Sequence, residues 1–115
     1  TGNGNVGIGT TNPAGKLDVN GSIYQRGSLR LPDYVFEPDY PLASIEAHAE
    51  QMWRQKHLPA VPPRQVDGDG REVVELGDQQ RGILEELETV HIYVEQLNRK
   101  IRELEAQVEA LKKRD

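Results

Sequence analysis

Apolar residues recur with a seven-residue period over the last third of the chain. One heptad position, d, is shared by Leu76, Ile83, Val90, Leu97, Leu104 and Leu111. The other, a, is shared by Gln80, Leu87, Val94, Ile101 and Val108. Alternating steps of four and three without a proline are typical of a coiled-coil helix. We therefore predict a helix over residues 79–113, capped by Asp78, with these residues as the core of a trimer.

The predicted helix is too long to be buried by its own chain. At 1.5 Å per residue it spans about 50 Å, whereas a compact chain of this length has a radius of gyration of about 13 Å. The only other predicted helix has about twelve residues, which is too short to cover the apolar seam by folding back. We therefore expect other copies of the chain to cover it.

Three parallel copies are favoured over two. The core residues alone would permit a parallel dimer, but Val90 at position d disfavours one. Residues 100–105 are similar to a trimer-favouring pattern, and we predict an ion pair between Lys100 at position g and Glu105 at position e of neighbouring chains. Gln80 is the one polar core residue. It either lines the axis, where three amides would hold water or an anion, or lies exposed in a frayed first turn.

Glycine and a two-residue alternation characterise the first 27 residues. Seven of the eleven glycines lie here. Val6 and Ile8, and later Leu17 and Val19, alternate with small or polar residues, which is the period of a strand buried on one face. Residues 12–15 separate the two strands as a turn. Two short strands are marginal in water, so this segment needs cover from elsewhere.

Residues 28–77 are predicted to form a small mixed head. Prolines bound Tyr34–Phe36, which favours a short extended segment. Ser44 caps a helix of about twelve residues, whose apolar face is expected to pack the head against its own or a neighbouring subunit. That face comprises Ile45, Ala49, Met52 and Trp53. Pro59 stops the helix, Asp67–Gly70 forms a turn, and Glu72–Leu76 forms a short strand.

Composition excludes several kinds of partner. The chain has 14 basic and 19 acidic residues, a net charge of −5, so we expect no nucleic-acid binding. No stretch approaches 18 consecutive apolar residues, so we expect no membrane insertion. Cysteine is absent, which excludes disulfides, thiolate metal sites and thiol catalysis.

No constellation for catalysis stands out, and we expect neither an enzyme nor a cofactor. Ser22, Ser28 and Ser44 are the only serines, and none is accompanied by a nucleophile motif. Asp67–Gly70 begins like a calcium loop, but Arg71 stands where that loop needs an oxygen donor. A plain turn is the favoured interpretation.

The three histidines give little support for a metal site within one chain. His48, His57 and His91 lie in three separate segments, whereas zinc ligands converge on one ion. His91 occupies position e beside the seam, so three copies could meet near a trimer axis as metal ligands or as a pH-sensitive ring. A solvent-facing role is the favoured interpretation.

Two parts of the chain resemble the C-terminal regions of bacterial surface fibres and phage-type tail fibres. The first is Gly4–Pro13, followed by Lys16–Gly21. The second is Asp33–Leu42 with His57–Pro62, followed by the leucine-rich helix. The resemblance covers nearly the whole chain. It implies a trimeric fibre tip or trimerisation module, joined to an upstream fibre shaft and located outside the cell, on a cell surface, virion or tail fibre.

A related class is the endosialidase-type intramolecular chaperone, which registers three chains and then cuts itself off at a serine. Its Ser-Asp opening is absent here, because Leu29 follows Ser28. Self-cleavage is therefore not expected, and a chaperone-like role without cleavage stays open.

The sequence predicts an extended α+β homotrimer. Residues 1–27 would form intertwined β-structure of the shaft, residues 28–77 the small mixed α/β head, and residues 78–115 a parallel trimeric coiled coil. The expected function is to nucleate and register trimer assembly and to cap a fibrous adhesin or tail fibre. The alternative is a tip that binds a surface glycan or protein receptor, with candidate contacts at Tyr24, Tyr34 and Tyr40.

Overall fold

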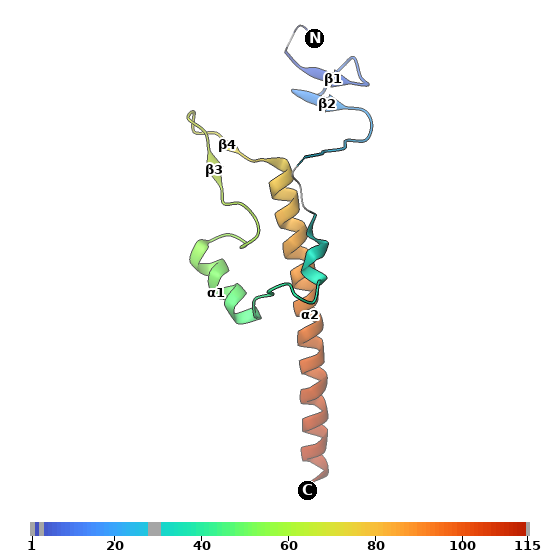
Figure 1. The fold of residues 1–115 in the computed structure, drawn as a ribbon, viewed down its shortest axis with the longest axis vertical. Coiled ribbons are helices and arrows are strands. Elements are labelled where there is room, and N and C mark those ends of the chain that lie inside the picture. The colour runs from blue at the N-terminus through green and yellow to red at the C-terminus, as the bar shows by residue number, and fades with distance from the viewer. Residues whose placement is uncertain (1, 3, 28–30, 115) are drawn as a thin grey trace.

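The computed structural model describes residues 2, 4–27 and 31–114, and shows an extended α+β chain. It measures 82 × 32 × 28 Å, with a radius of gyration of 22.1 Å. The long C-terminal helix accounts for most of this length, and its C-terminal half projects beyond the rest of the chain (Figure 1). The predicted α+β class and extended shape are confirmed.

The long helix α2 runs from Leu76 to Lys113 and begins three residues earlier than predicted. Its N-cap is Glu75 and not Asp78. The Glu75 carboxylate accepts hydrogen bonds from the backbone N–H groups of Asp78 (2.6 Å) and Gly77 (3.2 Å). The hydrogen bond from Asp78, and to a smaller extent that from Gly77, lowers the pKa of Glu75. The earlier start follows because this side chain reaches two N–H groups that have no partner within the helix.

The glycine-rich segment forms the two predicted strands, which pair in parallel. Residues 12–15 form no tight turn and lie within the longer loop that connects the strands. Strand β1 is Val6–Ile8 and strand β2 is Leu17–Val19. Beyond β2, the Asn20 side-chain amide donates a hydrogen bond to the Gly9 carbonyl at 3.2 Å. Gly9 has a φ of 79°, and a β-carbon on it would lie 2.9 Å from the Asn20 carbonyl oxygen. Glycine is therefore required where the chain leaves β1.

The apolar side chains of this strand pair are not covered within the chain. Val6, Ile8 and Leu17 are all exposed, and only Val19 is partly buried. As predicted, the two strands lack a core of their own.

The prediction of an extended segment around Tyr34–Phe36 is wrong, because residues Pro32–Phe36 form the 3-10 helix η1. Pro32 suits the first position of a helical turn because its fixed φ is already helical. In a 3-10 helix residues three apart lie on one side, and here that places Pro32 and Val35 together. Both are buried, and η1 packs on α2.

Helix α1 spans Ile45–Gln55, close to the predicted range. The Ser44 side-chain oxygen accepts a hydrogen bond from the Ala47 backbone N–H at 3.1 Å, which confirms the predicted N-cap. Lys56 ends the helix in the left-handed conformation. The chain then crosses α2 near Ala60 before entering a hairpin (Figure 1).

The hairpin consists of strand β3, Gln65–Val66, and strand β4, Glu72–Val73, paired antiparallel. Strand β4 is shorter than the predicted range, because Leu76 already belongs to α2. The Asp67 carboxylate accepts from the backbone N–H of Asp69 (2.9 Å) and of Arg71 (3.0 Å). This supports the plain-turn interpretation of Asp67–Gly70.

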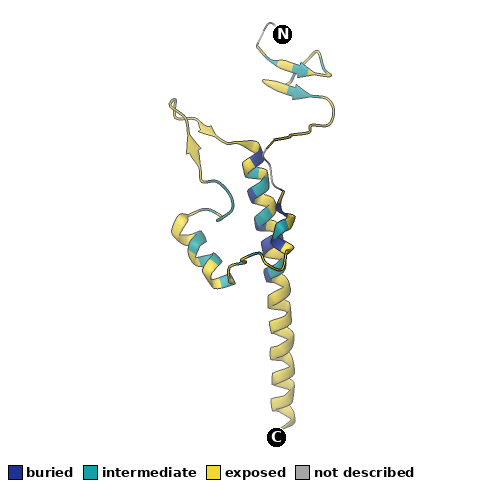
Figure 2. Ribbon diagram, in the orientation of Figure 1, coloured by how far each residue is buried: buried dark blue, intermediate teal, exposed yellow. Residues whose placement is uncertain are grey.

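Burial is confined to the N-terminal half of α2 and the segments against it. Val35 and Tyr93 are the buried large apolar residues there. From Val94 to Arg114 every residue is exposed, as Figure 2 shows along the projecting half of α2. The chain therefore holds a small core at one end of a long bare helix.

Candidate functional site

The apolar heptad face of α2 remains half exposed along its whole length. Its apolar members are between 45% and 63% exposed, and they are Leu76, Ile83, Leu87, Val90, Val94, Leu97, Ile101, Leu104, Val108 and Leu111. Gln80 is exposed as well. Because α2 begins at Leu76, Gln80 lies in its second turn. The interpretation of Gln80 as part of a frayed first turn is therefore not supported.

The head contacts a second stripe of residues on α2. Gly82, Glu86, Thr89 and Tyr93 follow one another in steps of four, three and four, and all are buried. At 3.6 residues per turn this stripe lies about a third of a turn from the heptad face. The head therefore docks on α2 without using the predicted trimer core.

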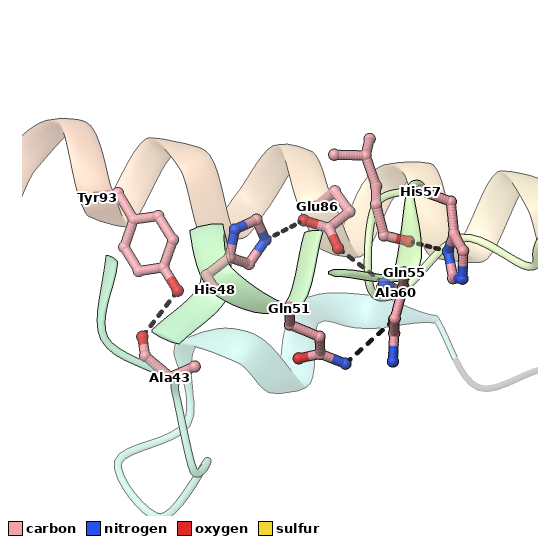
Figure 3. A network of polar contacts seen from close by, with 9 residues as sticks. Ala43, His48, Gln51, Gln55, His57, Ala60, Glu86 and Tyr93 are labelled. Carbon is pink, nitrogen blue, oxygen red and sulfur yellow. Dashed lines mark hydrogen bonds and ion pairs between the residues drawn. The ribbon is translucent and has the colours of Figure 1, made fainter. Parts of the chain in front are cut away.

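Polar contacts hold α1 and its flanking loops to this second stripe (Figure 3). Glu86 makes two of them. One carboxylate oxygen lies 2.7 Å from His48 Nε2, and the other accepts from the Ala60 backbone N–H at 2.7 Å. The Tyr93 hydroxyl donates to the Ala43 carbonyl at 2.7 Å, and its ring meets His48 edge-on at 5.5 Å. Side chains of α2 thus fix both ends of the α1 segment.

The residues of this second stripe were not predicted from the sequence, although two signals were present. Gly82 lies inside a helix with no role in the heptad, and glycine at such a position indicates a close approach of backbone. The four-three-four spacing of Gly82, Glu86, Thr89 and Tyr93 is itself a heptad, weaker than the apolar one because it contains polar residues.

The apolar face of α1 is only partly covered. Ile45, Ala49 and Met52 are partly buried, but Trp53 is 67% exposed, with the Lys56 ammonium 5.4 Å from its ring centre. Trp53 therefore packs little against its own chain. Its docking on a neighbouring subunit stays a prediction.

Lys100 and Glu105 lie on the projecting half of α2, and both are exposed. Within the chain Lys100 Nζ lies 3.6 Å from a carboxylate oxygen of Glu103, one turn along the same helix. An exposed pair of this kind contributes little stability and exchanges easily. The Lys100–Glu105 pair between chains stays a prediction.

Tyr34 and Tyr40, two of the three candidate receptor contacts, lie together. Their ring centres are 5.6 Å apart with the planes at 42°. The Tyr34 hydroxyl donates to Glu85, and Arg81 Nη1 lies 3.5 Å from the same hydroxyl oxygen. Burial first, and then Glu85, raises the pKa of both tyrosines. Tyr24 lies outside this group, 81% exposed, with the Arg26 guanidinium 5.8 Å from its ring centre.

The tyrosine pair borders a cleft of about 710 Å³ between η1, the start of α2 and the segment before η1. We call it the acidic cleft. Five carboxylates line it, those of Glu37, Asp39, Glu75, Asp78 and Glu85. Two guanidinium groups, those of Arg26 and Arg81, also line it.

A buried carboxylate lies on α2 near η1. Glu88 is 8% exposed, and neither of its carboxylate oxygens has a hydrogen-bond partner among the described residues. Burial, and then the charges of Asp33 and Glu85, raises the pKa of Glu88. Burying an unpaired charge is costly, so the charged form of Glu88 opposes the folded state.

The histidines do not converge. His48 bonds to Glu86, the His57 ring nitrogen lies 2.9 Å from the Leu58 carbonyl oxygen, and His91 is exposed. Within the described part of the chain, no group of three or more His, Asp or Glu side chains is arranged to hold a metal ion. Ser28, the residue considered for self-cleavage, lies outside the described residues.

Comparison with protein-family models, with curated proteins and with solved structures finds no match. Over the described residues, no helix combines the length and apolar character needed to cross a membrane.

Proposed function

We propose that this chain is a trimerisation and capping module at the end of a fibrous adhesin or tail fibre, acting outside the cell. The observation that carries the proposal is the uncovered heptad face of α2. Its apolar side chains are arranged in one stripe, and the head of the same chain packs on another. No described segment of the chain covers the stripe, and in our proposal further copies of the chain cover it.

Burying the apolar face of α2 provides enough free energy to drive assembly. Fully burying a Val, Leu or Ile side chain contributes about 1.5–3 kcal/mol. Completing the burial of ten half-exposed side chains therefore contributes on the order of 10 kcal/mol per chain. A trimer buries three such faces, on the order of 30 kcal/mol in total, and needs two association steps that each cost about 4–15 kcal/mol.

Three parallel copies fit the chain better than two. Val90 at position d disfavours a dimer. In a parallel trimer, position g of one helix faces position e of the next, so Lys100 and Glu105 would form a pair in place of the Lys100–Glu103 contact. Three copies would also cover Val6, Ile8 and Leu17 around one axis, where a single strand pair leaves them exposed.

The proposed mechanism is nucleation from the C-terminal end. The heptad face brings three chains together in one register, which lowers the entropy of closing the glycine-rich strands behind it. Those strands alone would register poorly, because flat glycine-rich strands specify their pairing weakly. The helix therefore acts as an internal chaperone for the shaft.

Size-exclusion chromatography with light scattering on the full chain tests the proposal. We expect a mass of about three times the 12.9 kDa of one chain. The double variant Ile101→Asp with Leu104→Asp should yield single chains, because it places charges in the seam. The matched control, Ala106→Asp with Ala110→Asp, adds the same charges at positions f and c, away from the seam, and should stay trimeric. A wild-type mass of one chain at all micromolar concentrations contradicts the proposal.

The alternative function, a tip that recognises a receptor or glycan, is favoured by one observation. Tyr34 and Tyr40 lie side by side on the wall of the acidic cleft. Aromatic rings beside a hollow are a common feature of recognition sites. This function and trimer assembly use different faces of α2, so the two can coexist.

A further inference from the structure

The acidic cleft carries more negative charge than its own residues balance. Five carboxylates against two guanidinium groups leave a formal surplus of three negative charges. Two of the carboxylates are already used. Glu85 bonds to Tyr34 and lies 3.7 Å from Arg81, and Glu75 caps α2.

The three other carboxylates of the cleft are exposed, and they belong to Glu37, Asp39 and Asp78. None forms an ion pair of 4 Å or less with a described residue. Glu37 and Asp39 follow η1, and Asp78 lies in the first turn of α2. The surplus charge is therefore spread over both walls of the cleft.

The tyrosine pair adds a second kind of attraction. Tyr34 and Tyr40 present two tilted rings on the wall that carries Glu37 and Asp39. The face of an aromatic ring attracts a cation, and the attraction strengthens where water is partly excluded. The carboxylates and the ring faces therefore both favour a positively charged ligand.

We propose that the acidic cleft binds an arginine- or lysine-bearing segment of a protein receptor. A neutral ligand would displace water from three carboxylates without compensating their charge, which is costly. An anionic ligand would be repelled. A guanidinium or ammonium group can pair with a carboxylate and lie over a tyrosine ring at the same time.

The cleft lies on the side of α2 opposite the heptad face. Its α2 residues Asp78, Arg81 and Glu85 occupy positions f, b and f of the heptad, which point outward in a coiled coil. The α2 wall of the cleft is therefore separate from the face that a coiled coil would bury. This inference deepens the receptor-binding alternative and does not depend on assembly.

Fluorescence anisotropy on the full chain tests the inference. The probe is a labelled peptide with two arginines separated by glycine, and its comparison is the same peptide with citrulline, which has arginine's shape without its charge. At about 0.1 M salt, where charges more than about 10 Å apart are largely screened, we expect the arginine peptide to bind. We expect the citrulline peptide to bind at least about ten-fold more weakly, a factor that corresponds to 1.4 kcal/mol.

The variant Glu37→Gln with Asp39→Asn should weaken arginine-peptide binding about ten-fold or more. The control, Glu103→Gln with Glu109→Gln, removes the same net charge from the outer face of the projecting half of α2. It should leave binding within about two-fold, because exposed charges that far from the cleft are largely screened by salt. Tyr40→Leu should weaken binding several-fold, because it removes the ring and keeps an apolar side chain.

Several results would overturn the inference: no binding of the arginine peptide, equal weakening by both carboxylate variants, or equal binding of the citrulline peptide. Binding of a neutral oligosaccharide that Glu37→Gln with Asp39→Asn abolishes would assign the cleft to a sugar instead. Light scattering on the same samples shows whether the chain has assembled, so a loss of peptide binding can be told from a failure of assembly. The comparison of the arginine and citrulline peptides on the wild-type chain remains a valid test even if a cleft variant fails to fold.

Discussion

The Ala60 carbonyl lies directly against Gly82 of α2. A β-carbon on Gly82 would stand 2.2 Å from that carbonyl oxygen and 2.9 Å from the Ala60 carbonyl carbon. The loop after α1 therefore crosses α2 at a point where only a hydrogen atom fits. Such a close approach fixes the head on one face of the helix and leaves the heptad face free.

Gly82→Ala should loosen the head. In an exposed helix this change would stabilise the chain by about 1 kcal/mol, but here the added methyl group displaces backbone, which costs about 1–3 kcal/mol. We expect a lower melting temperature by circular dichroism and faster proteolysis between residues 43 and 75. A rise in melting temperature would show that the loop does not contact Gly82.

Glu86→Ala should destabilise the head by removing both of its contacts. The Ala60 N–H and the His48 ring would lose their partner, and an unpaired buried polar group costs about 1–3 kcal/mol. Chemical denaturation measures the change. Glu95→Ala is the control, because Glu95 is exposed on the same helix and pairs only with Arg99 among the described residues; it should change stability by less than about 0.5 kcal/mol.

Glu88→Gln should stabilise the protein at neutral pH. The pKa of Glu88 is raised in the folded state, so the folded chain binds this proton more tightly than the unfolded chain. Stability therefore falls as pH rises from the ordinary glutamate pKa, about 4.3, through the raised value, and the penalty is complete above it. Below the ordinary pKa both states are protonated and the penalty vanishes.

The measurement for this prediction is the melting temperature of wild type and Glu88→Gln from pH 3.5 to pH 7.5. We expect the variant to melt higher at pH 7.5, with the gap closing toward pH 3.5. Glu109→Gln, an exposed change at the same heptad position, should show no such gap. A Glu88→Gln gap that is constant across this range would contradict an unpaired buried charge.

The coiled coil should protect the glycine-rich strands at a distance. If three chains close β1 and β2 around one axis, the backbone N–H of Val6 and of Asn20 will exchange slowly with solvent in the assembled protein. Ile101→Asp with Leu104→Asp should abolish this protection, although both residues lie far along α2. Hydrogen exchange detects it, and the Ala106→Asp with Ala110→Asp control should retain it. Unchanged protection in the seam variant would show that the strands close independently.

Much of the local structure follows from nearby residues. Ser44 caps α1 because its hydroxyl meets the N–H of a residue three positions on. The turn at Asp67–Gly70 follows from an aspartate that accepts backbone hydrogen bonds within four residues. Such contacts depend on sequence neighbours alone, so their pattern is visible without the fold.

The predictions from the sequence fail where contacts with distant segments determine the conformation. Tyr34–Phe36 was predicted as extended from the flanking prolines, but η1 forms because Pro32 and Val35 become buried together on α2. The acidic cleft could not be predicted from either of its walls. Tyr34 and Asp78 are far apart in the chain, and only packing brings η1 to the first turn of α2.

By itself, the sequence determined the long helix and its apolar stripe, because a seven-residue repeat places side chains on one face through helix geometry alone. The tertiary structure decided that the head packs on the stripe of Gly82, Glu86 and Tyr93 and leaves the apolar stripe bare. That choice depends on where Ala60 and His48 come to lie, and a local pattern carries no information on contacts between segments so far apart in the chain.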